Sequence, residues 1–127
     1  MKHTLLIIDD DNLILNTLRE NFSRMPGEIF TAQTVSQAKD LLGRIKPEVV
    51  LTDLLLPKAT GAGEIMDFMK ADPALAQVPV LIFTNLDTPE LRQTMAEKGA
   101  KEYMIKGSFS LDDLFNRVMQ YLEPVQR

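Results

Sequence analysis

Five polar or charged side chains each stand just after a short run of residues typical of a buried β-strand. They are three carboxylates, one hydroxyl and one ammonium group: Asp9, Asp10, Asp53, Thr84 and Lys106. If the runs are parallel strands of one sheet, their carboxyl ends meet at one edge, where ligands of such sheets bind. We therefore expect these five side chains to form a single site.

The three carboxylates predict a bound cation. Two carboxylates a few ångströms apart repel each other by roughly 4 kcal/mol at an effective dielectric constant of about 20. Hard oxygen donors select Mg²⁺, which usually keeps some water and takes one or two carboxylates together with phosphate oxygens. An ionised Asp53 can then attack phosphorus, while Lys106 neutralises the transferring oxygens and Thr84 donates a hydrogen bond. The residue set predicts phosphoryl transfer onto Asp53.

Taken one at a time, these residues also have ordinary structural explanations. Asp10 or Asp11 can cap the helix that follows the first strand. Asp53 and Thr84 can be turn residues at the ends of strands. Lys106 alone is more often a solvated lysine. The functional interpretation depends on the fact that all of them occur together at strand ends.

Five runs of residues predict the β-strands. Three runs are uninterrupted and apolar, as expected of strands covered on both faces, and two weaker runs have the mixed pattern of sheet edges. The uninterrupted runs are Leu5–Ile8, Val49–Leu51 and Val80–Phe83, and the edge candidates are Ile29–Ala32 and Glu102–Ile105.

Helical patterns with start and stop signals lie between and after these runs. Thr34 and Gln37 have the spacing of a capping box, and Thr88-Pro89 supplies an N-cap with proline at the first helical position. The expected apolar stripes are Ile14, Leu18, Phe22 and Met25; Val35, Ala38, Leu42 and Ile45; Ile65, Met66 and Met69; Leu91 and Met95; and Leu111, Leu114, Phe115, Val118 and Leu122.

Strict alternation of five strands and five helices with short connections predicts an α/β fold. Parallel strands with right-handed crossovers give a three-layer, doubly wound sheet. Two strand orders are familiar for five strands, a flavodoxin-like 2-1-3-4-5 and a Rossmann-like half. We find no repeat or linker that would divide the chain, so residues 1–127 are expected to form one domain.

Composition excludes several classes of function. The chain has 127 residues, 45% of them hydrophobic, no cysteine and a formal net charge of −4. Direct binding to nucleic acid is not expected, because there is no basic field for counterion release. Thiol chemistry is excluded, and the early apolar run is too short for a signal peptide or a membrane span. We expect a cytoplasmic protein with no membrane partner.

Together these residues resemble the receiver domain of response regulators in two-component signalling, including the chemotaxis regulators. The resemblance covers essentially the whole chain. The family pattern is an acidic pair after the first strand, a phosphoacceptor Asp some 40 residues later, then Thr or Ser, then Lys. Further matches are Pro57 and Gly61 after the acceptor, and Gly99-Ala100, Glu102-Tyr103 and Ile105-Lys106 around the last strand.

The resemblance implies a role for each residue of the site and selects the strand order 2-1-3-4-5. Asp9 and Asp10 would hold Mg²⁺ together with Asp53 and the backbone carbonyl of Leu55. Asp53 would be phosphorylated, with Thr84 and Lys106 contacting the phosphoryl group. Such a domain is not an enzyme in the usual sense, because it catalyses at most its own phosphorylation and dephosphorylation.

The resemblance also implies partners. A sensor histidine kinase or a phosphotransfer protein would supply the phosphoryl group. Tyr103 would be the aromatic switch on the output face, which is built from the fourth helix, the fifth strand and the fifth helix. A downstream protein, or a second copy of the chain after phosphorylation, would bind there. Because the sequence ends close after the fifth helix, we expect a stand-alone receiver.

Four positions depart from the family pattern. Gly107 replaces the proline that usually follows the lysine through a cis bond, and we predict a trans Lys106–Gly107 bond because a non-proline cis bond costs about 2.5–4 kcal/mol. Asn85 replaces a small residue after Thr84. Leu55 and Leu86 are apolar where the family often places groups that affect the attacking water, so we predict slow self-dephosphorylation. Asn85 and Gly107 favour an alternative, a pseudo-receiver that binds proteins without being phosphorylated.

Other classes of site fit the sequence less well. A flavin carrier needs hydroxyl and amide donors after the first strand, where this chain has three aspartates. A haloacid-dehalogenase-like hydrolase needs a second Asp two residues after the nucleophile, where this chain has Leu55. His3 is the only histidine and lies at the opposite end of the first strand, so a Ser-His-Asp triad or a histidine-bound metal is not expected.

Overall fold

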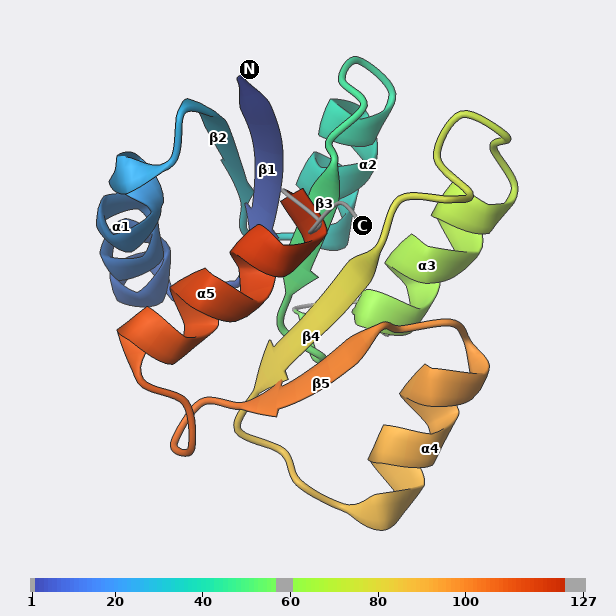
Figure 1. The fold of residues 1–127 in the computed structure, drawn as a ribbon. Coiled ribbons are helices and arrows are strands. Elements are labelled where there is room, and N and C mark those ends of the chain that lie inside the picture. The colour runs from blue at the N-terminus through green and yellow to red at the C-terminus, as the bar shows by residue number, and fades with distance from the viewer. Residues whose placement is uncertain (1, 57–60, 123–127) are drawn as a thin grey trace, which may run out of the picture.

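The computed structural model describes residues 2–56 and 61–122 and shows five parallel strands in a single sheet (Figure 1). Hydrogen bonding connects the strands in the order β2-β1-β3-β4-β5. This order confirms the predicted doubly wound sheet and its predicted strand order 2-1-3-4-5. The strands are β1 (His3–Ile8), β2 (Gly27–Ala32), β3 (Val49–Thr52), β4 (Val80–Thr84) and β5 (Glu102–Ile105).

Helices cover both faces of the sheet and give the molecule three layers (Figure 1). One face packs against α1 and α5, and the other packs against α2, α3 and α4. The helices are α1 (Asn12–Asn21), α2 (Val35–Leu42), α3 (Ala62–Lys70), α4 (Pro89–Glu97) and α5 (Leu111–Leu122).

Each central strand contributes to both halves of the core, which explains its uninterrupted apolar run. Leu6 and Ile8 of β1 belong to the cluster beneath α2 and α3, whereas Leu5 and Ile7 belong to the cluster beneath α1 and α5. All four side chains are at most 1% exposed. Alternation along a strand sends neighbouring side chains to opposite faces, so a strand between two helical layers must be apolar throughout.

The sheet register aligns the ends of the strands at one edge. Ile8 of β1 lies opposite Thr52 of β3, and Thr84 of β4 lies opposite Ile105 of β5. Backbone hydrogen bonds continue past these pairs, from Asp53 N–H to the Ile8 carbonyl at 2.8 Å and from Lys106 N–H to the Thr84 carbonyl at 2.9 Å. The residues that leave the strands are therefore held by the sheet itself.

The first helix is shorter than its apolar stripe predicted. α1 ends at Asn21, and Phe22–Arg24 form a separate 3₁₀ turn. Phe22 is buried in this turn and Met25 just after it, so both were correct as core residues and wrong as members of the α-helix. The turn allows the chain to leave the helix and begin β2 at Gly27.

Two smaller predictions about helix ends also need correction. Thr34 caps α2 as expected, since its hydroxyl accepts from Gln37 N–H at 3.1 Å, but the Gln37 side chain accepts from Gln33 N–H at 2.7 Å rather than from Thr34. Leu111 is 45% exposed, because the first residue of α5 precedes the part of the helix that packs on the sheet. Ile45 lies beyond the end of α2.

Across the described residues we find no helix that combines the length and the apolar character needed to cross a membrane.

Candidate functional site

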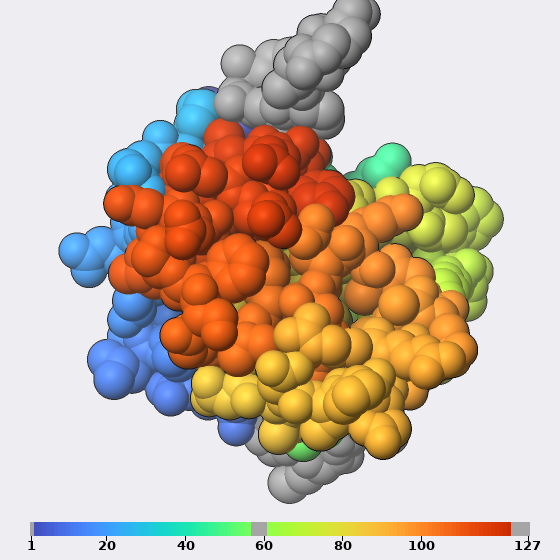
Figure 2. Space-filling model, turned by 60° about the horizontal axis from the view of Figure 1, so that its bottom comes forward, coloured from blue at the N-terminus to red at the C-terminus, as the bar shows by residue number. Residues whose placement is uncertain are grey.

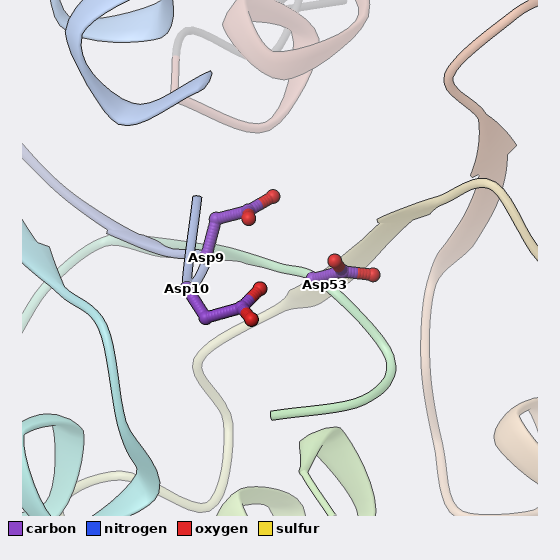
Figure 3. Close-up of side chains that lie close together, drawn as sticks. All are labelled: Asp9, Asp10 and Asp53. Atoms are coloured by element: carbon purple, nitrogen blue, oxygen red, sulfur yellow. The ribbon is translucent and has the colours of Figure 1, made fainter. Parts of the chain in front are cut away.

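Three carboxylates meet at the edge of the sheet where β1 and β3 end (Figure 3). Asp9, Asp10 and Asp53 each present one oxygen, and these three oxygens all lie within 4.8 Å of one another. Asp9 is 2% exposed, Asp53 is half-buried and Asp10 is open to solvent. The structure thus brings together the three aspartates that the sequence placed in one site.

Lys106 joins the carboxylates from the end of β5. Its Nζ lies 2.7 Å from Asp9 Oδ2 and 3.2 Å from Asp53 Oδ2. The lysine side chain is only 13% exposed, so it is not the solvated lysine that the ordinary interpretation allowed. One ammonium group therefore partly neutralises two of the three acids.

Backbone amides hold the two carboxylates that Lys106 contacts. Asp9 Oδ1 accepts from the N–H of Asp11 at 2.9 Å, and Asp53 Oδ1 accepts from the N–H of Leu54 at 2.7 Å. The oxygen that remains on each residue is the one paired with Lys106. These bonds fix both carboxylates before any ligand arrives, which is the preorganisation that electrostatic catalysis requires.

The pKa values of the paired groups Asp9 and Lys106 are both raised. Burial raises the pKa of Asp9, although hydrogen bonds from Lys106 and from the Asp11 backbone oppose the shift. Burial alone would lower the pKa of Lys106, but its hydrogen bond to Asp9 and the charge of Asp53 together outweigh burial and raise that pKa. The ammonium form of Lys106 is therefore stabilised at neutral pH.

Thr84 is the last residue of β4, between the strands that lead to Asp53 and Lys106. It is 1% exposed, and its Oγ1 accepts a hydrogen bond from Leu86 N–H at 3.3 Å. A hydroxyl that accepts one bond keeps its own proton for donation. The Thr84 hydroxyl is thus able to donate the hydrogen bond that was predicted from the sequence.

Asp11, rather than Asp10, caps the first helix. Asp11 Oδ1 accepts from the N–H groups of Leu13 at 2.9 Å and Ile14 at 3.4 Å. This resolves the ambiguity that the run of three aspartates left open, because capping is the task of the third aspartate. The Asp10 side chain belongs to the acidic cluster instead.

The loop after Asp53 is closed by a glycine that no other residue could replace without strain. Gly61 has a φ of 76°, and a Cβ at this position would lie 2.1 Å from the carbonyl oxygen of Leu54. The N–H of Ala62 donates to the same carbonyl at 2.9 Å. Pro57, the other loop residue singled out in the sequence, lies outside the described residues.

The four departures from the family pattern are all at the surface of this edge. The Lys106–Gly107 bond is trans as predicted, since none of the described peptide bonds is cis. A Cβ on Gly107 would have no atom within 4 Å. Asn85 is exposed, and Leu55 and Leu86 are 56% and 37% exposed.

Tyr103 lies on β5, half-buried against the cluster beneath α2, α3 and α4. Its hydroxyl donates to the backbone carbonyl of Leu86 at 2.7 Å, and burial raises the pKa of its phenol. Sequence reasoning missed its neighbours Arg92 and Asp87, which form an ion pair at 2.7 Å. Both side chains are exposed, so neither residue belongs to the apolar pattern from which packed positions were predicted.

Comparison with known proteins agrees with this fold. Probable transcriptional regulator ycf27 of Porphyridium aerugineum is 29% identical over 99% of this chain and 50% of its own length. The signal receiver domain of a putative Luxo repressor protein from Vibrio parahaemolyticus superposes with a TM-score of 0.87, at 23% identity, over 97% of this chain and 92% of that one. The Mn²⁺-bound form of response regulator Rcp1 superposes with a TM-score of 0.80, at 25% identity, over 98% of this chain and 97% of that one.

The fold and the acidic edge define a doubly wound signalling domain of the two-component type. The family model for the response regulator receiver domain matches residues 5–119, and the chain belongs to this family. Members of the family are signalling domains rather than enzymes in the usual sense. The chain spans about half the length of the curated relatives that it matches.

Proposed function

We propose that this chain accepts a phosphoryl group on Asp53 in a Mg²⁺-dependent reaction and transmits the change to a partner protein. One observation carries the proposal above all others: the Asp53 carboxylate lies 3.2 Å from the ammonium group of Lys106 and within 4.8 Å of two further acids. A carboxylate placed beside a cation and a candidate metal site is suited to attack phosphorus, because the charge of the phosphoryl oxygens can be neutralised there.

In the proposed reaction an oxygen of Asp53 forms a bond to phosphorus as the bond from phosphorus to the donor breaks. The donor's leaving group takes the electron pair of that bond. Lys106 Nζ stabilises negative charge on the transferring oxygens, and the Thr84 hydroxyl donates a hydrogen bond to one of them. The Leu54 N–H, 2.7 Å from Asp53 Oδ1, holds the carboxylate in position throughout.

Asp9, Asp10 and Asp53 would hold the Mg²⁺ ion, together with the backbone carbonyl of Leu55. The donor set fits a hard divalent cation, since three carboxylate oxygens lie within 4.8 Å of one another and one of the acids is open to water. Mg²⁺ would neutralise charge on the phosphoryl oxygens when bound. The Mn²⁺-bound form of the similar regulator Rcp1 supports a divalent-ion site in this family.

The phosphoryl donor would be a sensor histidine kinase or a phosphotransfer protein, in the cytoplasm. Output would pass through the face formed by α4, β5 and α5, which Figure 2 shows as the band from yellow to red. Tyr103 lies on the middle element of this face. A downstream protein, or a second phosphorylated copy of the chain, would bind there, and residues 1–127 would act as one receiver domain without direct contact to nucleic acid or membrane.

A second candidate function is a pseudo-receiver that binds its partner without phosphorylation. Asn85 favours it, because this exposed amide directly follows Thr84 and would crowd an incoming phosphoryl group. Gly107 also favours it, because it replaces the residue that usually shapes the loop after the lysine. The Lys106 contacts to Asp9 and Asp53 favour the phosphoacceptor instead.

Intact-mass measurement after incubation with acetyl phosphate and Mg²⁺ separates the two functions. We expect wild type to gain the mass of one phosphoryl group, and to lose this ability when Mg²⁺ is chelated. Asp53→Asn should gain nothing, because an amide is a far weaker nucleophile than a carboxylate.

Asp40→Asn is the matched control, since Asp40 is an exposed aspartate of α2 and its substitution leaves the site intact. A folded wild type that takes up no phosphate from several small donors would contradict the phosphoacceptor proposal. The pseudo-receiver would then be the better description, and the next variants would be Asn85→Ala and Gly107→Pro.

A further inference from the structure

The loop between β4 and α4, residues 85–88, is held at two points by side chains from other elements. The hydroxyl of Tyr103 donates to the carbonyl of Leu86 at 2.7 Å. Arg92 Nε donates to Asp87 Oδ1 at 2.7 Å. Both loop residues are exposed, so the packing of the core does not by itself fix this loop.

Arg92 also contacts Tyr103. The guanidinium carbon lies 5.0 Å from the centre of the tyrosine ring, within the range of a cation–π contact. A guanidinium nitrogen of Arg92 lies 3.5 Å from the backbone carbonyl of Tyr103. One side chain therefore connects the loop, through Asp87, with both the ring and the backbone of β5.

These contacts continue to the candidate site through a single residue. Leu86 N–H donates to Thr84 Oγ1 at 3.3 Å, and the carbonyl of the same leucine accepts from Tyr103. A Thr84 hydroxyl that turned toward a phosphoryl group on Asp53 would change its bond with Leu86. The position of the Leu86 carbonyl, and with it the Tyr103 hydroxyl, would change as well.

We propose that Arg92 is a positioning residue that clamps the β4–α4 loop and Tyr103 in the unphosphorylated arrangement. The coupling to phosphorylation rests on the function proposed above, whereas the clamp itself does not. Releasing Arg92 lowers the cost of moving the loop, so phosphorylation of Asp53 becomes easier. A contact affects this equilibrium only if it is weaker in one of the two states. Arg92 would meet that condition, because Asp87 follows Leu86 in the loop and a shift of the Leu86 carbonyl would displace Asp87 from Arg92.

The strength of the clamp must be modest. The side chains of Arg92 and Asp87 are 44% and 54% exposed, so solvent and salt screen their attraction. An exposed ion pair together with a cation–π contact corresponds to a change of about two- to fivefold in an equilibrium. A hollow of about 140 Å³, lined by Arg92, Met95 and Tyr103 among others, leaves room beside the ring for it to move.

The test observes Tyr103 directly, in unphosphorylated protein without Mg²⁺. The chain has two tyrosines, so carbon-13 labelling of tyrosine rings gives two sets of NMR signals, and Tyr121→Phe assigns them. We expect Arg92→Ala and Asp87→Asn to shift the Tyr103 signals and to sharpen them through faster ring motion. Arg92→Lys should give a smaller change, because lysine keeps the ion pair and loses the planar stacking group.

Arg44→Ala is the matched control, because Arg44, just after α2, also forms an exposed ion pair, 3.2 Å from Asp40 of that helix. A second measurement follows the rate of phosphate uptake from acetyl phosphate with Mg²⁺. We expect Arg92→Ala to react about two- to fivefold faster than wild type, and Arg44→Ala to match wild type.

Unchanged Tyr103 signals in Arg92→Ala would overturn the clamp, as would equal changes in Arg44→Ala. Changed signals with an unchanged rate of phosphate uptake would overturn its coupling to Asp53. A wild type that takes up no phosphate would end the phosphoacceptor proposal, and the NMR signals would still decide whether Arg92 holds Tyr103.

Discussion

Lys106 is the residue on which the charge balance of the site depends. Its ammonium group lies between a carboxylate that is almost fully buried, Asp9, and the proposed phosphoacceptor Asp53. Removing one member of a buried ion pair leaves the other charge without compensation, which costs more than the pair itself contributes. The lysine therefore supports both the proposed chemistry and the stability of the strand ends.

We predict that Lys106→Met lowers the free energy of unfolding by roughly 3 kcal/mol at pH 7 without Mg²⁺. Methionine preserves the apolar part of the lysine side chain, so the loss of stability measures the contribution of the charge. Urea denaturation followed by circular dichroism measures it. Lys98→Met is the control, because Lys98 pairs with the exposed Asp67 at 3.2 Å and its loss should cost less than about 1 kcal/mol. Equal losses in the two variants would contradict the assigned role of Lys106.

Leu55 is the residue that we expect to control how water reaches the proposed phosphoaspartate. Its side chain is 56% exposed and offers no hydrogen bond to an attacking water. We predict that Leu55→Asn accelerates loss of phosphate about fivefold, the effect of one hydrogen bond of about 1 kcal/mol on a rate. Leu55→Ala should also accelerate it by opening the approach. The decay of the phosphorylated mass after removal of the donor measures the rate.

Leu111→Asn is the comparison for this experiment, since Leu111 is also an exposed leucine but begins α5. Its rate of dephosphorylation should equal that of wild type. If neither Leu55 variant changed the rate, the apolar character of position 55 would not be what slows dephosphorylation.

Among the connections between elements, the one from β3 to α3 is the most constrained by backbone geometry. Gly61 has a left-handed φ, and a Cβ at this position would collide with the carbonyl oxygen of Leu54. This close approach lets Ala62 N–H bond the same carbonyl and so begins α3 next to Asp53. The glycine of the family pattern thus has a steric reason in this chain.

We predict that Gly61→Ala destabilises the protein by about 1–3 kcal/mol, the cost of a strained backbone conformation, with a further loss from the clash. Gly107→Ala is the matched control, because a Cβ there meets no atom within 4 Å, and its effect should stay within about 0.5 kcal/mol. Thermal unfolding of the two variants beside wild type measures the difference. A smaller effect for Gly61→Ala than for Gly107→Ala would refute this account of the loop.

α5 is joined to β5 by a polar network on the proposed output face. Glu102 accepts from Arg117 and from the hydroxyl of Tyr121. Burial and this hydrogen bond raise the pKa of Tyr121 to about 12. Because the folded state holds the phenol proton more tightly than the unfolded chain, this contribution to stability is complete below pH of about 10. It is lost as the pH rises from there through about 12.

We predict that Glu102→Gln lowers the pKa of Tyr121 and reduces the loss of stability at alkaline pH. Absorbance titration of phenolate measures the pKa in a Tyr103→Phe background, where Tyr121 is the remaining tyrosine. Glu97→Gln, on α4, should leave the titration unchanged. An unaltered pKa in Glu102→Gln would show that burial alone causes the shift.

The molecule as a whole concentrates negative charge at one edge of its sheet. Three carboxylates and one lysine converge there, in a chain with a net charge of −4. Packing of the apolar strands between two helical layers forces the strand ends together, although the carboxylates repel one another. A bound divalent cation should therefore stabilise the fold as well as take part in the chemistry.

We predict that Mg²⁺ at about one hundred times its dissociation constant adds about 2.7 kcal/mol to the free energy of unfolding, and that chelation removes this increment. Asp10→Asn should reduce it, because Asp10 offers one of the three clustered oxygens. Asp112→Asn is the control, as this aspartate of α5 is 83% exposed and pairs with Arg24. Equal increments in the two variants would place the bound ion elsewhere.

Much of the fold followed from the sequence for local reasons. The uninterrupted runs such as Leu5–Ile8 reflect burial on both faces, and the caps at Thr34 and Thr88 depend on bonds only three residues long. The helix ends were less predictable. Phe22 and Met25 continued the apolar period of α1 while lying beyond its end. Residues buried in or beside a 3₁₀ turn are apolar, as are residues buried in an α-helix, so the sequence pattern does not distinguish the two.

The amino-acid sequence was sufficient to place Asp9, Asp10, Asp53, Thr84 and Lys106 at the ends of strands, because strand periodicity and residue type are local properties. The cap at Asp11, by contrast, required the folded chain. So did the contacts of Lys106 with Asp9, 97 residues away, and of Arg92 with Tyr103. Contacts between distant segments depend on how the layers pack, and a one-dimensional pattern does not contain that information.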